Sequence, residues 1–429
     1  MLKITTIDEA NEALSVYIPL SREITGKNIT LDRMTPLMKA VGNPESRLKI
    51  IHIAGTSGKT STTYFITALL VATGKSVGTT VSPHVDSITE RVQINGQPVG
   101  DAEFCLALTE FIDIVDSSGL NPTYFELLIA FAYWYFDRAH VDYAVIETGL
   151  GGLHDGTNVA TKVDKICVIT DIGFDHMHVL GKTIESIALQ KAGIIHTGNH
   201  ALMYSQSPAV NQVVTDWSTK RKATLTLLNQ MELAEGLQIT SAIKKLPAFQ
   251  QRNWLLAYAA FRYVSARYSM PMLETEMVER TMHTLVPARM EVRITSGKTI
   301  VMDGAHNGQK MSAFITSFKK LYPNRKATVI LSLKKGKEYT EILPLLLPVT
   351  DTLIVCGFES VQDMYVTSIS PRELAGAAQE QGFQDVNIAN SIDEAYNALI
   401  SSTNNICIIT GSFYLVSELR KRHTELKYA

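Results

Sequence analysis

A glycine-rich segment that ends in a lysine and two hydroxyl residues is the strongest chemical signal in this sequence. The segment Gly55-Thr56-Ser57-Gly58-Lys59-Thr60-Ser61 follows a run with the β-branched residues Ile50, Ile51 and Ile53 and precedes an apolar helical pattern. Such a turn aims several N–H groups at one point, where the positive end of a helix dipole reinforces them. We expect phosphate to bind there, with Lys59 on the outer phosphates and a hydroxyl of Thr60 or Ser61 near a magnesium ion. The segment is shorter than a full Walker A motif, so an ordinary strand–turn–helix junction is the alternative.

A carboxylate follows another predicted strand. Glu147 ends the run Tyr143–Ile146 and stands just before Gly149, Gly151 and Gly152. A carboxylate at the end of a buried strand beside a phosphate loop suits Mg²⁺, which prefers oxygen ligands. Taken alone, Glu147 fits an exposed strand-end acid better, and the neighbouring Gly-Lys-Thr segment is what favours the metal.

Four further polar positions allow a chemical or a purely structural interpretation. Lys191 lies near the end of a helical pattern that Gly193 stops, where a lysine usually complements the helix dipole. Asp303 could accept hydrogen bonds from a ribose, and Asn307 could cap the helix that follows it. Arg289 could clamp phosphates or form a surface salt bridge.

The elements that must position these residues alternate between strand and helix patterns. This alternation predicts an α/β fold whose N-terminal phosphate-loop domain has a mainly parallel sheet flanked by helices and right-handed crossovers. After Pro287 the alternation restarts, which predicts domains of 1–287 and 288–429, the second smaller and Rossmann-like. Residues 224–250 show no clear pattern. Ligands of such folds lie beyond the carboxyl ends of strands. Five positions fall just past predicted strand ends and could face a common cleft: Gly55, Ser82, Glu147, Thr170 and Asp303.

The bulk composition narrows the classes of partner. The 429 residues carry 40 Lys plus Arg against 42 Asp plus Glu, and this near-balance argues against nucleic acid or an anionic membrane as the main partner. The four cysteines form no CxxC pair and fit buried reduced thiols. No signal peptide is evident, and the most apolar segment, Leu127–Phe136, is too short to span a bilayer. We expect a cytoplasmic monomer that acts on small molecules.

Taken together and in this order, the motifs resemble the folylpolyglutamate synthase and dihydrofolate synthase family, within the Mur ligase superfamily. The resemblance covers nearly the whole chain and rests on ten pieces: Ala54–Ser61, Ser82–His84 with Glu90-Arg91, Thr123–Glu126, Glu147–Gly152 with Asp155–Asn158, Gly173–His176, Lys191–Ile194, Phe249–Asn253, Pro287–Glu291, Asp303–Asn307 and Thr410–Tyr414.

The resemblance implies roles for individual residues. It implies ATP and two magnesium ions as cofactors, with Ser82, Glu147 and His176 as metal ligands. It identifies Lys191 with a lysine that is carbamylated in the family, and it places Lys59, Lys191 and His176 in catalysis. Around the nucleotide it adds an adenine-side contact, a phosphate contact, a ribose contact and a histidine beside them: Asn253, Arg289, Asp303 and His306. On the pterin and substrate side it implies Pro83, His84, Arg91, Thr123, Tyr124, Phe125, Glu126, His154, Asp155, Gly156 and Ser412.

Several positions depart from the family pattern. Leu153 stands where the family usually has arginine, and Gly156 stands where it has alanine. Thr60 replaces the glycine of most folate ligases, and Ala288 replaces the glycine before Arg289. No departure removes a metal or nucleotide contact, whereas Leu153 and Gly156 affect the expected pterin specificity.

The sequence therefore predicts an ATP-dependent ligase that adds L-glutamate to a folate or dihydropteroate carboxylate through an acyl phosphate. A Mur-type amino-acid ligase acting on another carboxylate is the first alternative. Thr60 gives it slight support, and the lack of a recognisable uridine-binding domain before Ile50 opposes it. A phosphate-loop kinase or nucleotide switch is the second, but it leaves the segment Asp303–Asn307 unexplained.

Overall fold

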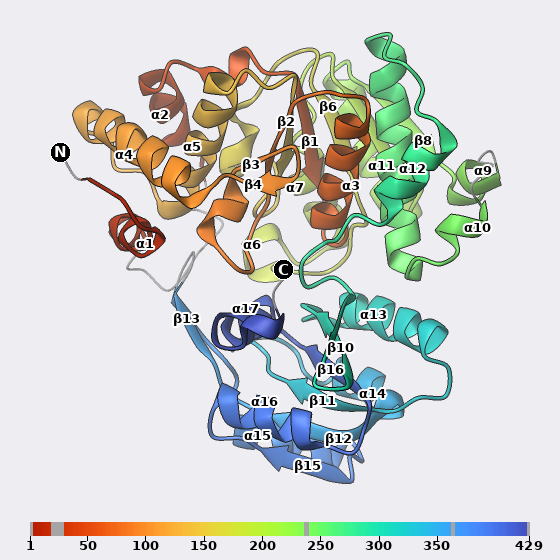
Figure 1. Ribbon diagram of the computed structural model, residues 1–429. Helices are drawn as coiled ribbons and strands as arrows, with labels where there is room; N and C mark the ends of the chain where they lie inside the picture. The colour runs from red at the N-terminus through yellow and green to blue at the C-terminus, as the bar shows by residue number, and fades with distance from the viewer. Residues whose placement is uncertain (1–2, 19–29, 236–239, 362–364, 427–429) are drawn as a thin grey trace. The chain divides into compact units, whose positions relative to one another are not determined.

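The chain folds into two compact units, seen here in a computed structural model that describes residues 3–18, 30–235, 240–361 and 365–426 (Figure 1). The first unit comprises Met1–Leu246 and Gln250–Thr284, and the second comprises Pro247–Phe249 and Leu285–Ala429. The sequence analysis placed the domain boundary after residue 287.

The first unit is built on an eight-stranded sheet within the described residues. Six neighbouring strands run parallel, and the short antiparallel hairpin β3–β4 extends one edge. In spatial order the strands are β4 (Gln97–Pro98), β3 (Gln93–Ile94), β2 (Val77–Thr80), β5 (Tyr143–Glu147), β1 (Ile50–Ala54), β6 (Ile166–Ile169), β7 (His200–Tyr204) and β8 (Thr224–Leu228).

The central strands are buried along their whole length because helices cover both faces of the sheet, which is why they read as continuous apolar runs. Side chains of β1 and β5 join a core cluster with the helices of one face, and those of β6 join a second cluster on the same face. Figure 1 shows α4 and α5 on one side of the sheet and α3 and α11 on the other. The helices of this unit are α1 (Ile7–Ser15), α2 (Met34–Ala40), α3 (Lys59–Ala72), α4 (Asp101–Ser118), α5 (Tyr124–Arg138), α6 (Met177–Leu180), α7 (Ile184–Ala192), α8 (Pro208–Lys220), α9 (Gln230–Glu235), α10 (Thr240–Ile243), α11 (Ala248–Arg267) and α12 (Thr275–Met282).

The second unit has its own sheet and its own core. Within the described residues its main sheet has six strands, parallel except for β9 at one edge, and a two-stranded hairpin, β13–β14, stands apart. In spatial order the main strands are β15 (Asp385–Ile388), β12 (Thr350–Val355), β11 (Ala327–Leu331), β16 (Ile406–Thr410), β10 (Lys298–Asp303) and β9 (Glu291–Thr295). The remaining elements are β13 (Glu359–Val361), β14 (Tyr365–Thr367), α13 (Gly308–Leu321), α14 (Leu343–Leu346), α15 (Pro371–Glu380), α16 (Ile392–Ser401) and α17 (Phe413–Arg422).

The predicted fold class is confirmed, and most differences lie where the sequence pattern was weak. The segment 224–250, which had no assignment, contains β8, α9, α10 and the start of α11. The strand β7 and the helix α8 after it were not predicted. The antiparallel edges β3–β4 and β9 add to the expected parallel sheets.

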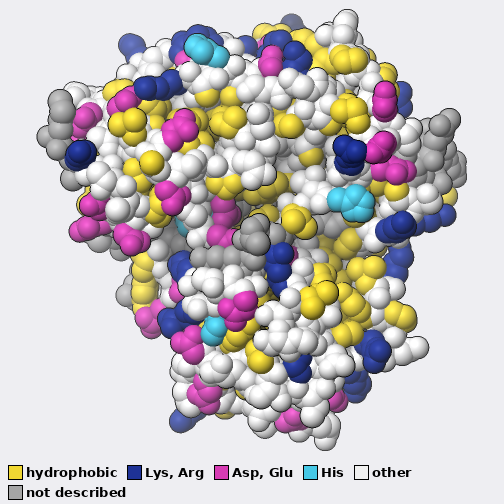
Figure 2. Space-filling model, viewed as in Figure 1, with side chains coloured by type: hydrophobic (Ala, Val, Ile, Leu, Met, Phe, Trp, Pro, Cys, Tyr) yellow, Lys and Arg dark blue, Asp and Glu magenta, His cyan; other side chains and the backbone are white. Residues whose placement is uncertain are grey.

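The surface carries no obvious specialisation on the face seen in Figure 2, where acidic and basic side chains are interspersed. Among the described helices, none combines the length and the apolar character needed to cross a membrane. The four cysteines are free and buried.

Candidate functional site

The turn between β1 and α3 has a backbone that only glycine fits at two positions. Gly58 has φ +90° and stands at the N-cap of α3, and a Cβ there would lie 2.3 Å from Oδ1 of Asn253. A Cβ on Gly55 would lie 1.8 Å from Oγ1 of Thr170. Side chains from α11 and from the end of β6 therefore press directly on the loop, and both glycines are required by close approach as well as by conformation.

The first half of this loop is fastened to the segment that follows β6. The N–H groups of Thr56 and Ser57 both donate to the main-chain oxygen of Asp171, at 2.8 and 3.1 Å. The hydroxyl of Thr56 donates to the carbonyl of Gly173 at 2.9 Å. These N–H groups are thus engaged within the protein. The first N–H groups of α3, which have no preceding helical turn to bond to, are the ones that suit an incoming anion.

Two lysines converge on the loop. Lys59 Nζ donates to the carbonyl oxygen of Gly55 at 3.2 Å, and Lys191 Nζ donates to the same oxygen at 2.9 Å. Lys191 belongs to the last turn of α7 and is buried. The sequence suggested a lysine that complements the helix dipole, whereas the structure directs its ammonium group to the phosphate loop.

The structure brings three of the predicted residues together at the end of β5. Glu147 is 2 % exposed; its Oε1 accepts a hydrogen bond from the Thr60 hydroxyl at 2.8 Å, and its Oε2 accepts one from the Ser82 N–H at 3.3 Å. Ser61, the next residue of α3, has a buried hydroxyl oxygen with no hydrogen-bond partner among the described residues. A buried carboxylate and a buried, unpartnered hydroxyl beside a phosphate loop are oxygen donors of the kind Mg²⁺ takes, so these residues fit the expected metal.

His176, the third predicted metal ligand, stands at a distinctive backbone position. It has φ +50°, precedes α6, and has a side chain that is 40 % exposed, with Nε2 3.8 Å from Oδ1 of Asp175. No group of three or more His, Cys, Asp or Glu side chains able to hold a metal occurs in the described part of the chain. The predicted ligand set of Ser82, Glu147 and His176 has only two side chains of these types, so the absence of a group of three from the described residues does not test it. Its role as a metal site stays a prediction.

The segment Ser82–Arg91 is held by its own polar groups. The carboxylate of Glu90 accepts bonds from the N–H groups of the three residues Val85–Ser87, and Arg91 Nε donates to His84 Nδ1 at 3.1 Å. Burial raises the pKa of Glu90, against the lowering effect of these N–H groups. Arg91 is 2 % exposed, so the predicted substrate residue lies in the interior of this unit.

Two other carboxylates on the predicted substrate side also bind within the protein. Glu126 closes a capping box with Thr123 at the start of α5, and its two oxygens accept Arg33 Nε at 3.2 and 2.9 Å. Asp155 accepts the N–H groups of Leu150 and Thr157 at 2.7 and 3.0 Å, and burial raises its pKa. These two acids shape the loops around them.

The remaining members of this group differ in exposure. Tyr124 and Gly156 are buried, Pro83 and Phe125 are half-buried, and His154 is exposed. Phe125 closes over the glycine turn, since a Cβ on Gly149 would lie 2.5 Å from its ring. Their substrate roles stay predictions.

In the second unit, Arg289 is presented by a strained turn. Its neighbours Ala288 and Met290 have φ +53° and +52°, a region that is costly for residues with a side chain. The left-handed conformation at Ala288 is one that glycine would adopt at lower cost. The guanidinium carbon of Arg289 lies 3.9 Å from the ring centroid of Phe413, a close cation–π contact.

Asp303 lies at the end of β10 and supports this turn. Its Oδ2 accepts the Met290 N–H and its Oδ1 accepts the Ala305 N–H, both at 2.9 Å. Burial raises its pKa to about 6, while Arg289, the two N–H groups and Lys310 oppose that rise. Each carboxylate oxygen can accept a second bond, so the predicted ribose contact stays a prediction.

The neighbouring predicted residues of this unit also have defined partners. Asn307 caps α13 by accepting the Lys310 N–H at 2.9 Å, as predicted. His306 Nδ1 lies 2.9 Å from the carbonyl oxygen of Gly304, and its Nε2 lies 3.0 Å from Lys310 Nζ. Ser412 caps α17 by accepting the Tyr414 N–H at 3.2 Å.

Sequence reasoning missed the salt bridges that hold these positions. Asp171 directly follows a predicted strand, but nothing in the pattern identified Arg252 as its partner. The pairs Arg33–Glu126 and Arg420–Glu291 join residues more than ninety positions apart. Only an alignment of many sequences or a structure could have paired them.

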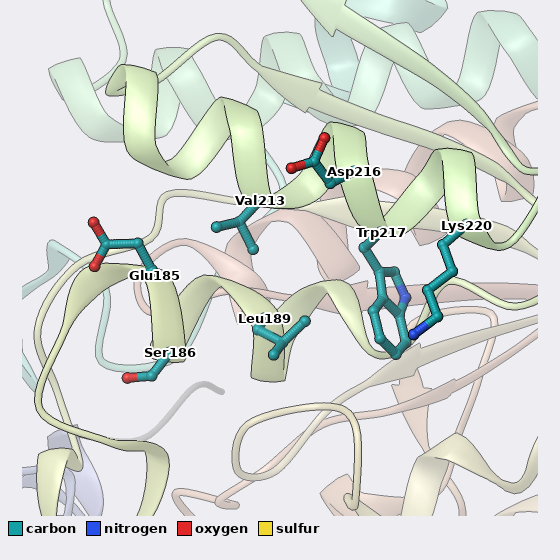
Figure 3. A pocket seen from close by; sticks show the side chains of 7 residues that line it. All are labelled: Glu185, Ser186, Leu189, Val213, Asp216, Trp217 and Lys220. Atoms are coloured by element: carbon teal, nitrogen blue, oxygen red, sulfur yellow. The ribbon is translucent and has the colours of Figure 1, made fainter.

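An open groove of about 350 Å³ lies between α7 and α8 and contains none of the predicted site residues. Figure 3 shows Val213 and Trp217 of α8 pointing toward Leu189 of α7, with Glu185 at one end and Lys220 at the other. Lys191, which also belongs to α7, does not line this groove and is buried. The groove is therefore a surface feature separate from the phosphate loop.

The chain is similar to known proteins over nearly its whole length. Residues 53–245 match the Mur ligase middle domain, and residues 288–422 match the dihydrofolate synthetase C-terminal domain. Folylpolyglutamate synthase of Lacticaseibacillus casei is 31% identical over 91% of this chain and 93% of its own length. Dihydrofolate synthase/folylpolyglutamate synthase of Bacillus subtilis is 29% identical over 91% of this chain and 94% of its own.

Solved structures agree. The structure of Mycobacterium tuberculosis folylpolyglutamate synthase complexed with ADP is similar with a TM-score of 0.83 and 26% identity, covering 99% of this chain and 98% of that one. The phosphate loop, the strand-end Glu147 and the two matched domains lead to one conclusion: the chain belongs to the folylpolyglutamate synthase/dihydrofolate synthase family of Mur-type ligases.

Proposed function

We propose that this protein is an ATP-dependent ligase that joins L-glutamate to the carboxylate of a folate or of dihydropteroate. One observation carries the proposal within the first unit. Lys59 and Lys191 converge on the Gly55 carbonyl beside the start of α3, while Thr60 in the same helical turn holds the buried Glu147. Cations, a helix N-terminus and a buried carboxylate suited to a metal ion, all around one loop, are the parts that phosphoryl transfer requires.

In the first step the γ-phosphoryl group of ATP passes to the substrate carboxylate, and an acyl phosphate and ADP form. The N–H groups at the start of α3 orient the phosphates, and Lys59 offsets the charge that develops on them. Glu147, with Ser82 and His176, would hold magnesium, which supplies a further positive charge to the phosphate oxygens. No covalent bond to the protein is needed, so positioning and electrostatics account for the catalysis.

In the second step the amine of L-glutamate attacks the acyl carbon, and inorganic phosphate leaves as the amide forms. Lys191 is proposed to act here as its carbamate. Carbamylation converts the ammonium group into an anion, and an anion beside the phosphate loop would favour binding of a second magnesium ion. An ammonium group would disfavour it.

We assign Asn253, Arg289, Asp303 and His306 to the nucleotide on the strength of the resemblance. Asn253 lies against Gly58 of the loop, which supports its place near the nucleotide. Arg289 is held out on a strained turn and backed by the Phe413 ring, an arrangement that suits a phosphate contact. A cytoplasmic monomer is proposed with them, and the four free, buried cysteines fit a reducing compartment.

The test is phosphate release from ATP and magnesium in the presence and absence of L-glutamate and of a reduced folate or dihydropteroate. Release is expected to require both organic substrates, with a product one glutamate heavier by mass spectrometry, and Glu147→Ala is expected to abolish it. ATP turnover that ignores both substrates would point to a kinase or a nucleotide switch. Turnover with a UDP-linked carboxylate alone would point to a Mur-type ligase. Either result contradicts the assignment.

A further inference from the structure

Residue Asp171 connects the phosphate loop to α11 through two different groups. Its main-chain oxygen accepts the N–H groups of Thr56 and Ser57, so it fixes the first half of the loop. Its carboxylate accepts the guanidinium of Arg252 in α11, with Nε 3.0 and 2.8 Å from the two oxygens and Nη2 2.7 Å from Oδ1. A displacement of the Arg252 side chain would therefore be transmitted through Asp171 to the loop.

Arg252 itself is held in place on several sides. Its guanidinium carbon lies 4.1 Å from the ring centroid of Tyr204, and its Nη1 donates to Gln230 Oε1 at 2.7 Å. The Tyr204 hydroxyl donates to the main-chain oxygen of Arg252 at 3.0 Å. Tyr204 thus orients both the side chain and the backbone of this residue, and it ends β7, a strand of the same sheet as β1.

The residue after Arg252 touches the other half of the loop. A Cβ on Gly58 would lie 2.3 Å from Oδ1 of Asn253, so the asparagine side chain packs directly on the loop where α3 begins. Consecutive residues of α11 therefore locate both halves of the loop. Arg252 acts through Asp171 on Thr56 and Ser57, and Asn253 acts on Gly58.

We propose that Arg252 is a positioning residue that sets the distance between the phosphate loop and Asn253 and thereby the affinity for the nucleotide. The proposal rests on the proposed function, because it takes the loop and Asn253 as the two sides of the nucleotide site. Arg252 needs no contact with the nucleotide. The bidentate pair between Arg252 and Asp171 is directional, so a lysine at position 252 cannot reproduce it. Without the arginine, Asp171 can shift, and the N–H groups of Thr56 and Ser57 that donate to its main-chain oxygen shift with it.

This role predicts a specific kinetic signature. Loss of the Arg252–Asp171 pair, called the clamp below, changes the bound geometry of ATP and ADP. It therefore raises the KM for ATP and the Kd for ADP together. The KM values for the folate and for L-glutamate stay unchanged. A residue that merely stabilises the fold would lower the unfolding temperature without raising the Kd for ADP.

The experiment measures ADP binding by calorimetry and steady-state kinetics on the full-length protein, with the variants Arg252→Met, Arg252→Lys and Asp171→Asn. Arg252→Met is expected to raise the Kd for ADP and the KM for ATP about tenfold, with kcat changed less than about threefold. Arg252→Lys is expected to recover only part of this loss. The double variant Asp171→Asn/Arg252→Met is expected to lose no more than Arg252→Met, because the two residues act as a unit.

The matched control is Arg47→Met, which removes the bidentate pair that Arg47 forms with Asp137 in the same unit. That pair is expected to affect thermal stability without any change in ADP affinity. An Arg252→Met protein that binds ADP as tightly as the wild type overturns the clamp and leaves the proposed function standing. A folded wild-type protein that binds no ADP overturns both.

Discussion

The ammonium groups of Lys59 and Lys191 donate hydrogen bonds to one and the same oxygen, the carbonyl of Gly55. Two like charges brought side by side at a neutral acceptor repel each other, and an anion between them or a change in the charge of one of them relieves the repulsion. A bound phosphate is such an anion, and carbamylation of Lys191 is such a change in charge. The relationship therefore makes the charge state of Lys191 a testable property.

Variants of Lys191 distinguish a role of its positive charge from a role of its carbamate. If the carbamate acts in the reaction, Lys191→Ala is expected to lose at least about a hundredfold in kcat, with partial rescue by added acetate or formate as a substitute anion. Lys191→Arg, which keeps a cation that cannot be carbamylated, is expected to stay inactive. Labelled bicarbonate followed by NMR on the wild-type protein checks the modification directly. An active Lys191→Arg enzyme would show that the positive charge alone suffices.

Thr60 is expected to tune the metal dependence of the reaction. Its hydroxyl donates to Oε1 of Glu147, and this bond fixes the carboxylate proposed to hold magnesium. Thr60→Ala is expected to raise the magnesium concentration for half-maximal activity about tenfold, since outer partners of metal ligands typically contribute that much. The control is Thr67→Ala in the same helix, which removes a buried hydroxyl that is hydrogen-bonded to Thr79 of β2. Equal magnesium curves for both variants would argue that Glu147 needs no such support.

The elements around this site could be predicted from the sequence, because strand and helix periodicity and glycine spacing are local signals. The turn before α3, the strand that delivers Glu147 and the cap at Asn307 are of this kind. The partners of charged groups could not be predicted. Glu126 and Asp155 were expected on the substrate side, yet their carboxylates bind Arg33 and main-chain N–H groups, and those partners become neighbours only when the chain folds. Family resemblance identifies such positions without revealing how they are held.

Asp303 is expected to make the stability of the protein depend on pH in a defined window. Its pKa is raised in the folded protein from 3.8 to about 6, so the folded state binds the proton more tightly than the unfolded state does. The stabilisation that this proton provides is fully present below about pH 4, declines as the pH rises toward 6, and is absent above it. The total change is about 2–3 kcal/mol.

The measurement compares the unfolding temperatures of the wild type and Asp303→Asn across this range, since the comparison cancels the other carboxyl groups. The wild type is expected to lose stability relative to the variant between about pH 4 and 6, with a constant difference above pH 6. Burial is the main cause of the raised pKa, and Arg289 and Lys310 limit it. A difference that stays flat from pH 4 to pH 7 would show that the carboxyl titrates at its ordinary value.

The ion pair of Arg420 and Glu291 is expected to be critical for the second unit. The two side chains are 0% and 1% exposed, and Glu291 Oε2 accepts both Arg420 Nη1 at 2.7 Å and the N–H of Ala288 at 2.9 Å. Arg420→Met removes the fully buried cation and leaves the carboxylate with Arg293, whose Nη2 lies 3.2 Å from Oε1. The variant is expected to cost about 3 kcal/mol of unfolding free energy, the low end for a broken buried pair, because Arg293 still offsets part of the charge. Urea denaturation measures this cost.

Neutralising the other partner provides the internal check. Glu291→Gln combined with Arg420→Met removes the buried negative charge and keeps an acceptor for the Ala288 N–H. Arg293, which pairs with the other oxygen of Glu291, is 19% exposed and can reach water, so the double variant is expected to be more stable than Arg420→Met alone. Arg422→Met, which breaks the half-exposed pair with Asp393, is expected to cost only about 0–1 kcal/mol. Equal losses for Arg420→Met and Arg422→Met would contradict the argument from burial.

Two glycines of the first unit are expected to respond to alanine in opposite ways. Gly58→Ala meets Asn253 Oδ1 at 2.3 Å and needs φ +90°, so it is expected to abolish ADP binding. A Cβ on Gly156 instead meets Met34 and Phe125 at 3.5 and 3.6 Å, which is ordinary contact. Gly156→Ala, the residue usual in the family, is therefore expected to stabilise the protein by about 0.4–1 kcal/mol through the unfolded state. Calorimetric ADP titration and thermal unfolding of both variants check this contrast. An unfolding temperature for Gly156→Ala below that of the wild type would show that this turn requires glycine for a reason other than space.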